Sequence, residues 1–192
     1  MTIQNRIDRA SRLSLKELLK DLPGGFNAIA DIIERRNAVD SFVRMMTARL
    51  PPIENVVMED RSIVGPDESL EVRVRIYKPV DFLESLPGML FIHGGGMIMG
   101  SIETENHKAA MLCKTIQSIV VSVEYRLAPE NPHPAQVQGC YEALVWMSKN
   151  AAELGFDTDR LAIVGGSAGG GLAIATALMA RDQEFPKLSF QM

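Results

Sequence analysis

The first 52 residues carry a helical pattern of apolar and polar positions. In the second half of this stretch, charged side chains fill one face and apolar residues recur every three or four positions on the other. Pro23-Gly24-Gly25 separates an earlier helix, Leu13 to Lys20, from this one, and Pro51-Pro52 ends it. The pattern predicts a helical segment over residues 1–52, which either packs on the surface of a domain or forms a cap over an active site.

From residue 54 onward the pattern changes to that of strands. Val56-Val57-Met58 is apolar, and Leu70 to Tyr77 alternates between apolar and charged residues. Gly65-Pro66-Asp67 provides turn residues between the two segments. The sequence therefore predicts an antiparallel hairpin with one solvated face.

Three later apolar runs predict buried strands, and helical patterns alternate with them. The runs are Met89 to Ile92, Ile119 to Val123 and Arg160 to Val164, and the helical patterns cover about 105–115, 136–152 and 172–181. Strands that alternate with helices in this way form mainly parallel sheets with helices on both faces. The predicted fold class is therefore α/β.

Composition and charge argue against nucleic-acid binding, membrane insertion and metal binding as the function of this chain. A formal net charge of −4 gives no electrostatic reason to expect nucleic acid or an anionic membrane as partner. The N-terminus has no apolar signal segment and no apolar run reaches membrane-spanning length, so we expect a cytoplasmic protein without stable membrane insertion. Cys113 and Cys140 are expected to be reduced thiols in the core, and no spacing implies a metal or a cofactor.

The stretch from Gly165 to Gly169 fits the pattern Gly-x-Ser-x-Gly between a predicted strand and an alanine-rich helix. A nucleophile elbow needs this order of strand, sharp turn and helix, and small neighbours let the chain turn back on itself. The stretch lacks the lysine of a phosphate-binding P-loop. The sequence therefore predicts that Ser167 is a catalytic nucleophile.

Two more motifs follow predicted strands. His93-Gly94-Gly95-Gly96 comes after the strand that ends at Ile92, and the residues from Glu124 to Glu130 (Glu-Tyr-Arg-Leu-Ala-Pro-Glu) come after the next. Parallel strands end at one edge of the sheet, so both motifs are expected near Ser167. Backbone N–H groups of the glycine run and of the residue after Ser167 can stabilise a tetrahedral oxyanion, each by about 3 kcal/mol.

The three motifs, in this order, resemble those of the α/β-hydrolases of the hormone-sensitive lipase group, the bacterial family IV esterases. The resemblance implies a helical cap over residues 1–52 and the N-terminal part of a hydrolase core over residues 53–192. It implies a carboxylic-ester hydrolase that acts on short- to medium-chain acyl esters through an acyl-serine at Ser167, without a cofactor. The residues implied for the oxyanion hole are Gly95, Gly96 and Ala168, with Gly94 shaping the loop and His93 holding it in place.

Some positions depart from the family pattern. Gly166 stands where Asp or Thr is common, which concerns the subgroup and its acyl preference, and Glu124 stands where Asp is frequent, in a motif expected to brace the elbow. Arg126 and Glu130 are expected to form a buried ion pair or a backbone brace. The methionines after the glycine run, Met97 and Met99, either line an acyl pocket or simply pack.

The catalytic base is the missing part. In this fold the carboxylate and the histidine of the triad follow the serine, but His93, His107 and His133 all precede Ser167. The segment from Pro186 opens as a strand and stops at Met192. We therefore expect an incomplete chain that lacks the C-terminal strands and hydrolyses esters poorly by itself. For the parent esterase, the sequence is compatible with a homo-oligomer.

Two alternatives remain at this stage. One is a small-molecule receptor on the same scaffold, because plant gibberellin receptors resemble this family and have lost the catalytic histidine. The other is a truncated product without function.

Overall fold

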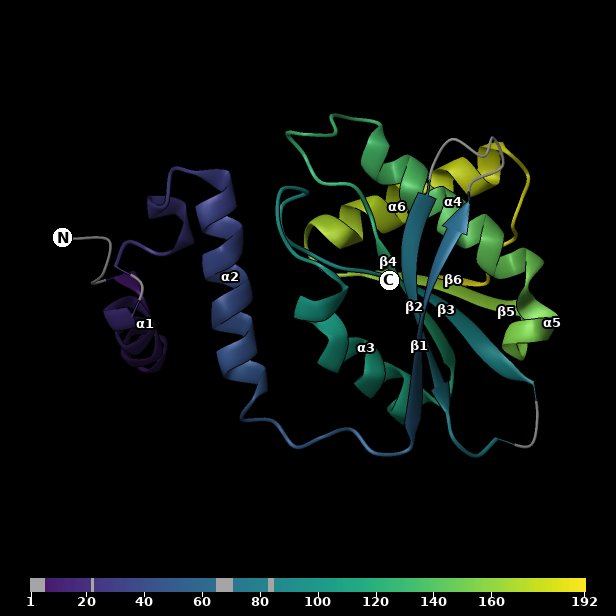
Figure 1. The fold of residues 1–192 in the computed structure, drawn as a ribbon, viewed down its shortest axis with the longest axis horizontal. Helices are drawn as coiled ribbons and strands as arrows, with labels where there is room; N and C mark the ends of the chain where they lie inside the picture. Colours follow the sequence, from purple (N-terminus) through teal and green to yellow (C-terminus); the bar gives the residue numbers. More distant parts are fainter. Residues whose placement is uncertain (1–5, 22, 65–70, 83–84) are drawn as a thin grey trace. The chain divides into compact units, whose positions relative to one another are not determined.

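The computed structural model describes residues 6–21, 23–64, 71–82 and 85–192. Contacts divide the chain into two compact units, Met1–Phe42 and Val43–Met192. The first unit contains α1 (Arg9–Asp21), the short 3-10 helix η2 (Phe26–Ala28) and the start of α2 (Ile32–Thr47) (Figure 1). The two helices that the periodicity predicts are therefore present.

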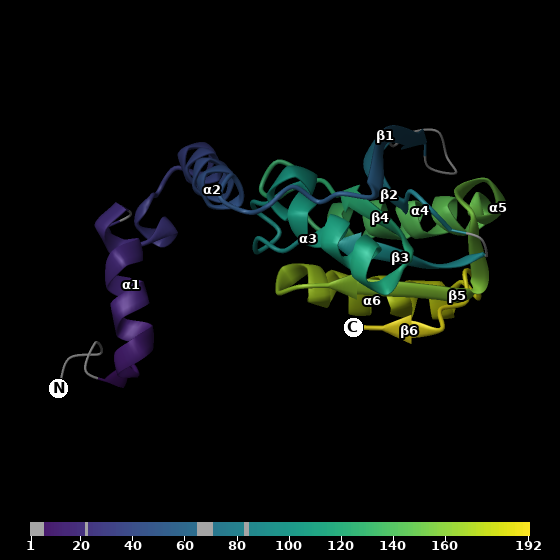
Figure 2. The same cartoon turned by 90° about the horizontal axis from the view of Figure 1, so that it is seen from below.

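The second unit contains a six-stranded sheet in the order β1-β2-β4-β3-β5-β6. The strands are β1 (Val56–Val64), β2 (Glu71–Pro79), β3 (Leu86–Ile92), β4 (Ile119–Glu124), β5 (Phe156–Gly165) and β6 (Phe190–Gln191). β1 and β2 pair antiparallel, which confirms the predicted hairpin, although its predicted turn at Gly65-Pro66-Asp67 lies outside the described residues. β2 pairs antiparallel with β4, and the remaining pairs are parallel. Figure 2 shows β1 at one edge of the sheet and β6 at the other.

Helices cover both faces of the sheet, as the alternation of elements predicts (Figure 1). They are α3 (Ile102–Ile116), α4 (Ala135–Lys149), α5 (Ala151–Leu154) and α6 (Ala168–Asp182). Along β3, Leu90 and Ile92 pack in the core that contains residues of α4, α5 and α6. Met89 and Phe91 pack on the other face, with residues of α3. Successive strand residues point to opposite faces, so each apolar run of the parallel strands is buried on both sides.

Several boundaries differ from the sequence prediction. α3 begins at Ile102 because Ser101 and Thr104 form a capping box and the carboxylate of Glu124 accepts a hydrogen bond of 2.8 Å from the N–H of Ile102. The helix expected over residues 136–152 is interrupted at Asn150, whose side-chain amide donates to the carbonyl of Trp146. The strand expected from Pro186 is reduced to two residues.

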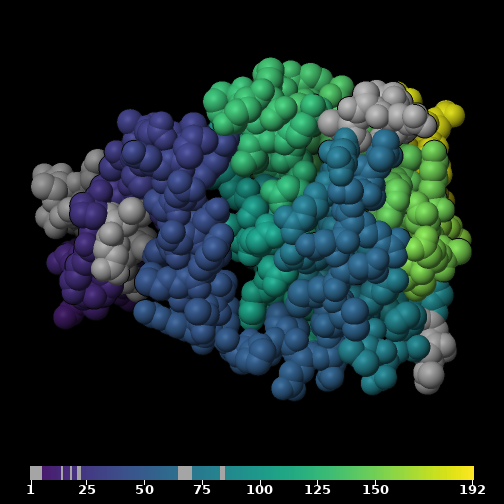
Figure 3. Space-filling model, viewed as in Figure 1, coloured from purple at the N-terminus to yellow at the C-terminus, as the bar shows by residue number. Residues whose placement is uncertain are grey.

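The hairpin lies at the surface of its unit (Figure 3). On its exposed side, Arg75 donates to both carboxylate oxygens of Asp60, at 2.5 and 2.8 Å, and Arg73 donates to Asp60 and to Glu103, each at 2.7 Å. The hydrogen bond from Arg75 is the main reason that the pKa of Asp60 lies well below its usual range. The solvated face predicted for the hairpin is thus an ion-pair network. Across the described residues, no helix combines the length and the apolarity needed to cross a bilayer.

Candidate active site

Ser167 lies at a sharp turn between β5 and α6. Its backbone has φ 56° and ψ −122°, and the residue is exposed. Residues other than glycine rarely adopt a positive φ, and such a conformation costs about 1–3 kcal/mol. Although Ser167 occupies the N-cap position of α6, its hydroxyl does not cap the helix. The strand, the strained turn and the helix predicted from the sequence are confirmed, and the hydroxyl is left available.

Two glycines of the elbow are required by close packing. A Cβ atom at Gly165 would overlap the carbonyl oxygen of Gly169 and lie 2.8 Å from the N atom of Gly170. A Cβ atom at Gly169 would overlap the carbonyl oxygen of Ile92 and lie 2.6 Å from that of His93. The first turn of α6 is therefore pressed against the ends of β5 and β3. By contrast, a Cβ atom at Gly166 would meet nothing within 4 Å, so this departure from the family pattern leaves open space.

The glycine loop after β3 contacts the elbow. A Cβ atom built on Gly94 would lie 3.1 Å from the carbonyl oxygen of Gly166 and 3.6 Å from the Cβ atom of Ser167. Gly95 and Gly96 have φ values of 116° and 66°, which glycine adopts without strain. The structure thus brings two of the three motifs together at one edge of the sheet, as the parallel topology predicts.

The N–H groups expected in the oxyanion hole lack protein partners. Within the described residues, the hydrogen bonds give no acceptor to the N–H of Gly95 or to that of Gly96. Ala168 is the first residue of α6, where an N–H group has no partner inside the helix. These three N–H groups therefore have no hydrogen-bond partner among the described residues, and their use as an oxyanion hole stays a prediction.

His93 and Tyr125 support the glycine loop from the interior. The His93 imidazole is fully buried and stacks on the Tyr125 ring, with centroids 4.1 Å apart and 13° between the planes. The Nδ1 atom of His93 lies 2.8 Å from the carbonyl oxygen of Gly94, and the Tyr125 hydroxyl donates to the carbonyl oxygen of His93 at 3.1 Å. These contacts support the loop-holding role expected for His93. They also identify Tyr125, which the sequence did not single out.

The segment from Glu124 to Glu130 was expected to brace the elbow. Two of its hydrogen bonds reach the glycine loop and the residue after it: the Tyr125 hydroxyl donates to the carbonyl of His93, and the N–H of Ala128 donates to the carbonyl of Met97 at 2.9 Å. Glu130 is exposed, which excludes the buried ion pair expected for it. The backbone brace comes from Gln136, whose side-chain amide donates to the carbonyl of Arg126 at 3.0 Å.

The histidines of the chain do not complete a triad. In the described part of the chain, no histidine forms a hydrogen bond with the Ser167 hydroxyl. His107 lies half-buried on α3, and His133 is exposed in a loop. In the part of the chain that the structure describes, the site thus holds a nucleophile candidate and three unpaired N–H groups, and no histidine is bonded to the serine.

Comparison with known proteins decides the family. The profile of a family described as alpha/beta hydrolase fold matches residues 89–192, more than half of the chain. The chain belongs to the α/β-hydrolase fold family. The matched region contains the glycine loop, the segment after β4 and the elbow of this α/β hydrolase.

Several relatives refine the comparison. The α/β hydrolase is similar to carboxylesterase NlhH of Mycobacterium tuberculosis, with 40% identity over 180 residues, 93% of this chain and 54% of that protein. It is similar to an arylesterase of Saccharolobus solfataricus, with 42% identity over 150 residues, 78% of this chain and 48% of that protein. A solved structure of a hyperthermophilic esterase from the archaeon Pyrobaculum calidifontis matches with a TM-score of 0.80 and 35% identity, over 92% of this chain and 55% of that one.

These relatives confirm the resemblance to the hormone-sensitive lipase group. The chain spans about half the length of the curated relatives it matches.

The side chains that ligate metals do not cluster in the described part of this α/β hydrolase, and its two cysteines are buried. Across residues 6–21, 23–64, 71–82 and 85–192, no group of three or more His, Cys, Asp or Glu side chains could hold a metal ion. Cys113 and Cys140 are free and buried, which confirms that they are core thiols. Burial raises the pKa of Cys113 to about 12, so its thiolate does not form near neutral pH.

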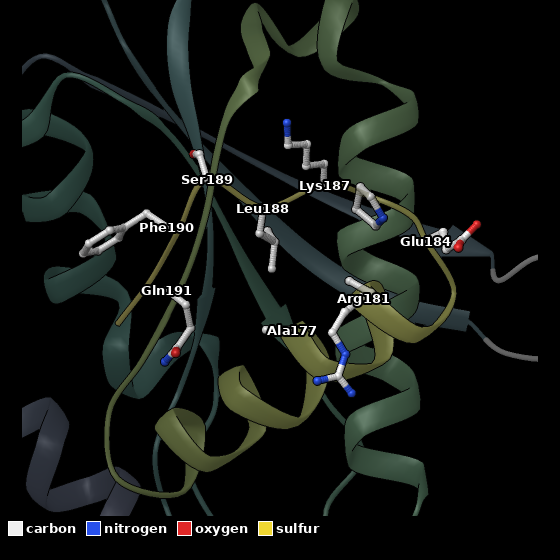
Figure 4. Close-up of a pocket in the computed structure, with 10 residues that line it drawn as sticks. Ala177, Arg181, Glu184, Lys187, Leu188, Ser189, Phe190 and Gln191 are labelled. Atoms are coloured by element: carbon white, nitrogen blue, oxygen red, sulfur yellow. The ribbon is translucent and has the colours of Figure 1, made fainter.

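A hollow of about 530 Å³ lies at the C-terminal end of α6, lined by residues of that helix and of the segment after it (Figure 4). Figure 4 shows Leu188 directed toward Ala177 of α6. Ala177 is ten residues beyond Ser167, which is about 15 Å along a helix with a rise of about 1.5 Å per residue. The hollow is therefore not the place where an acyl group would reach Ser167. Met97 packs against the core instead of lining this hollow.

The buried imidazole of His93 predicts a loss of stability in mild acid. Burial is the main cause that lowers its pKa, against smaller effects of the Gly94 carbonyl and of Glu105 and Glu103. A histidine in the unfolded chain titrates near about pH 6.5. Below that pH the unfolded chain binds more protons than the folded one. The free energy of unfolding therefore decreases as the pH is lowered.

We expect His93→Asn to flatten the stability profile between about pH 7 and pH 5. The measurement is the guanidinium chloride midpoint as a function of pH. His133→Asn, which replaces an exposed imidazole in a loop, is the control substitution. The stability that carboxylates such as Asp60 contribute is lost below about pH 4, so this loss is separated in pH from the one due to His93. Equal profiles for the wild type and His93→Asn would contradict the neutral, buried state of His93.

Proposed function

We propose that the protein to which this chain belongs hydrolyses carboxylic esters with short or medium acyl chains, and that Ser167 is the nucleophile. The observation that carries the proposal is the strained, exposed Ser167, whose hydroxyl makes no helix cap, in contact with a glycine loop that has free N–H groups. The names of the relatives, a carboxylesterase and an arylesterase, support the same chemistry. Because the chain spans 54% of NlhH, the proposal is made for the whole protein.

The chemistry follows from the positions of the groups. The Ser167 oxygen bonds to the ester carbonyl carbon while its proton passes to a histidine base, and the carbonyl oxygen becomes an oxyanion that the N–H groups of Gly95, Gly96 and Ala168 bind. The oxyanion then collapses, the bond to the alcohol oxygen breaks, and the alcohol leaves with the proton. Water attacks the acyl-serine in a second, equivalent step and releases the acid. In this fold the base and its carboxylate follow the serine in the chain.

Several finer features belong to the same proposal. Residues 1–52 would form a cap, and Gly94 would shape the loop of the oxyanion hole. A small-molecule ester would be the partner, and the protein would act in the cytoplasm. The open space at Gly166 supports a subgroup with an elbow that is less crowded than in relatives with Asp or Thr there.

A chromogenic assay tests the proposal. We expect the full-length protein to release p-nitrophenol from p-nitrophenyl acetate and butyrate with turnover, and acid quenching during turnover to trap one acyl group on the peptide that contains Ser167. Heat-denatured protein serves as the blank. Binding of the ester without release of p-nitrophenol would overturn hydrolysis and favour the receptor alternative.

A further inference from the structure

We propose that Tyr125 is a positioning residue of the oxyanion site. Its hydroxyl and its ring together set the orientation of the two peptide groups from His93 to Gly95, and thereby direct the N–H of Gly95 toward the substrate. The inference rests on the proposed function, because it assigns a residue outside the reacting groups to the step in which the oxyanion forms.

The hydroxyl of Tyr125 fixes the first peptide group. Tyr125 directly follows β4 and is 1% exposed, and its hydroxyl donates to the carbonyl oxygen of His93 at 3.1 Å. The same hydroxyl lies 3.4 Å from the carbonyl oxygen of Gly94, a longer and weaker contact. Both carbonyl groups therefore face the side of the loop where β4 ends.

The ring of Tyr125 fixes the second peptide group through His93. The stacked imidazole is held so that its Nδ1 atom lies 2.8 Å from the carbonyl oxygen of Gly94. A carbonyl oxygen only accepts hydrogen bonds, so Nδ1 must carry the proton and donate. The Nε2 atom is buried and has no partner among the described residues, which fits a neutral imidazole with its single proton on Nδ1.

Peptide geometry passes this orientation on to the donor. The peptide between Gly94 and Gly95 is trans, since the cis bonds of the described residues all precede prolines. In a trans peptide the N–H points away from the carbonyl, so the N–H of Gly95 faces the side opposite His93 and Tyr125. Gly94 lies next to the elbow, since a Cβ atom built on it would come within 3.6 Å of the Cβ atom of Ser167. The N–H of Gly95 thus points away from the side that His93 and Tyr125 occupy, and among the described residues it has no protein acceptor.

A run of glycines needs such external support. Glycine adopts positive and negative φ with similar ease, so Gly94 and Gly95 have little preference of their own for this orientation. Inside the loop, the carbonyl of Gly95 accepts hydrogen bonds from Ile98 and Met99, at 3.2 and 3.0 Å, which fixes the following peptide group. The two peptide groups before it depend on Tyr125 and His93.

The test is Tyr125→Phe in the full-length protein, which removes the hydroxyl and keeps the stacked ring. Complete removal of one oxyanion donor costs about 10²–10³-fold in kcat, so a displaced donor should cost about 10- to 100-fold, with KM changed by less than about 2-fold. Tyr141→Phe is the matched control, because the Tyr141 hydroxyl also donates to a backbone carbonyl, that of Phe185 at 2.7 Å, away from the site. It should leave kcat unchanged.

A kcat of Tyr125→Phe equal to that of Tyr141→Phe would overturn the inference. A second measurement uses the wild type and needs no variant: a long-range ¹H–¹⁵N spectrum should show His93 neutral and protonated on Nδ1. A proton on Nε2 instead would overturn the inference, because Nδ1 could then not hold the Gly94 carbonyl. If the wild type itself turned over no ester, the proposed function would fail, while the spectrum would still decide the orientation of the loop.

Discussion

Replacing Ser167 by alanine should lower kcat for p-nitrophenyl butyrate by about 10⁶-fold in the full-length protein, because no other group at the elbow can accept the acyl chain. The loss should appear in kcat, since the oxygen removed acts in the chemical step and contributes little to binding. Steady-state kinetics of the variant and the wild type, at equal folded concentration, provide the measurement.

Two features make this result specific. The oxyanion donors remain in Ser167→Ala, so a residual rate of about 10³–10⁴-fold over water should persist. Ser148→Ala, which removes a half-buried hydroxyl from α4, is the matched control and should keep the wild-type rate. A Ser167→Ala rate within tenfold of the wild type would remove Ser167 from the mechanism.

The second large effect concerns packing at the elbow. Gly169→Ala should lower the unfolding free energy by about 1–3 kcal/mol or more, because the added methyl group overlaps the carbonyl oxygen of Ile92 and approaches that of His93. These two carbonyls are part of the backbone, so no side-chain rotation can relieve the overlap. The first turn of α6 must move, and we expect kcat to fall with it.

Gly171→Ala is the matched control for this prediction. Gly171 lies two residues later in α6, and a Cβ atom there would meet nothing within 4 Å. Alanine inside a helix should therefore stabilise the protein by about 0.5–1 kcal/mol. Urea unfolding curves of both variants and the wild type measure the difference. Equal unfolding free energies for Gly169→Ala and Gly171→Ala would show that the contact between α6 and the end of β3 is not as close as described.

The sequence allowed the edge of the sheet to be predicted because local and global signals agree there. All three motifs follow apolar runs: the glycine run, the segment after β4 and the elbow. Parallel strands bring their carboxyl ends to one edge of the sheet, so the motifs must meet there. The position of Gly94 next to Gly166 and Ser167 confirms that reasoning, although these residues are far apart in the chain.

The support behind this edge could not be predicted in the same way. Tyr125 and His93 stack because β3 and β4 are neighbours and in register, and nothing in the sequence near Tyr125 gives the direction of its ring or its hydrogen-bond partner. The interruption at Asn150 likewise depends on one side-chain bond to Trp146, which no periodicity reveals. Tertiary contacts that rest on single hydrogen bonds leave little trace in a hydrophobic pattern.

The glycines illustrate the same limit. The sequence presents Gly165, Gly166 and Gly169 as equivalent members of one motif. In the structure two of them are forced by backbone contacts, and Gly166 borders open space. Only the packing of α6 against β3 and β5 distinguishes the required positions from the tolerant one. The role of residues 1–52 as a cap stays a prediction.

The most direct test of the central claim is active-site labelling. The full-length protein is treated with a fluorophosphonate, which bonds to serines activated as nucleophiles, and the label is mapped by peptide mass spectrometry. We predict one label per chain, on Ser167, with loss of ester hydrolysis in the same proportion. Hydrolysis that continues with Ser167 fully labelled, or a label that inactivates the enzyme from another serine, would contradict the account.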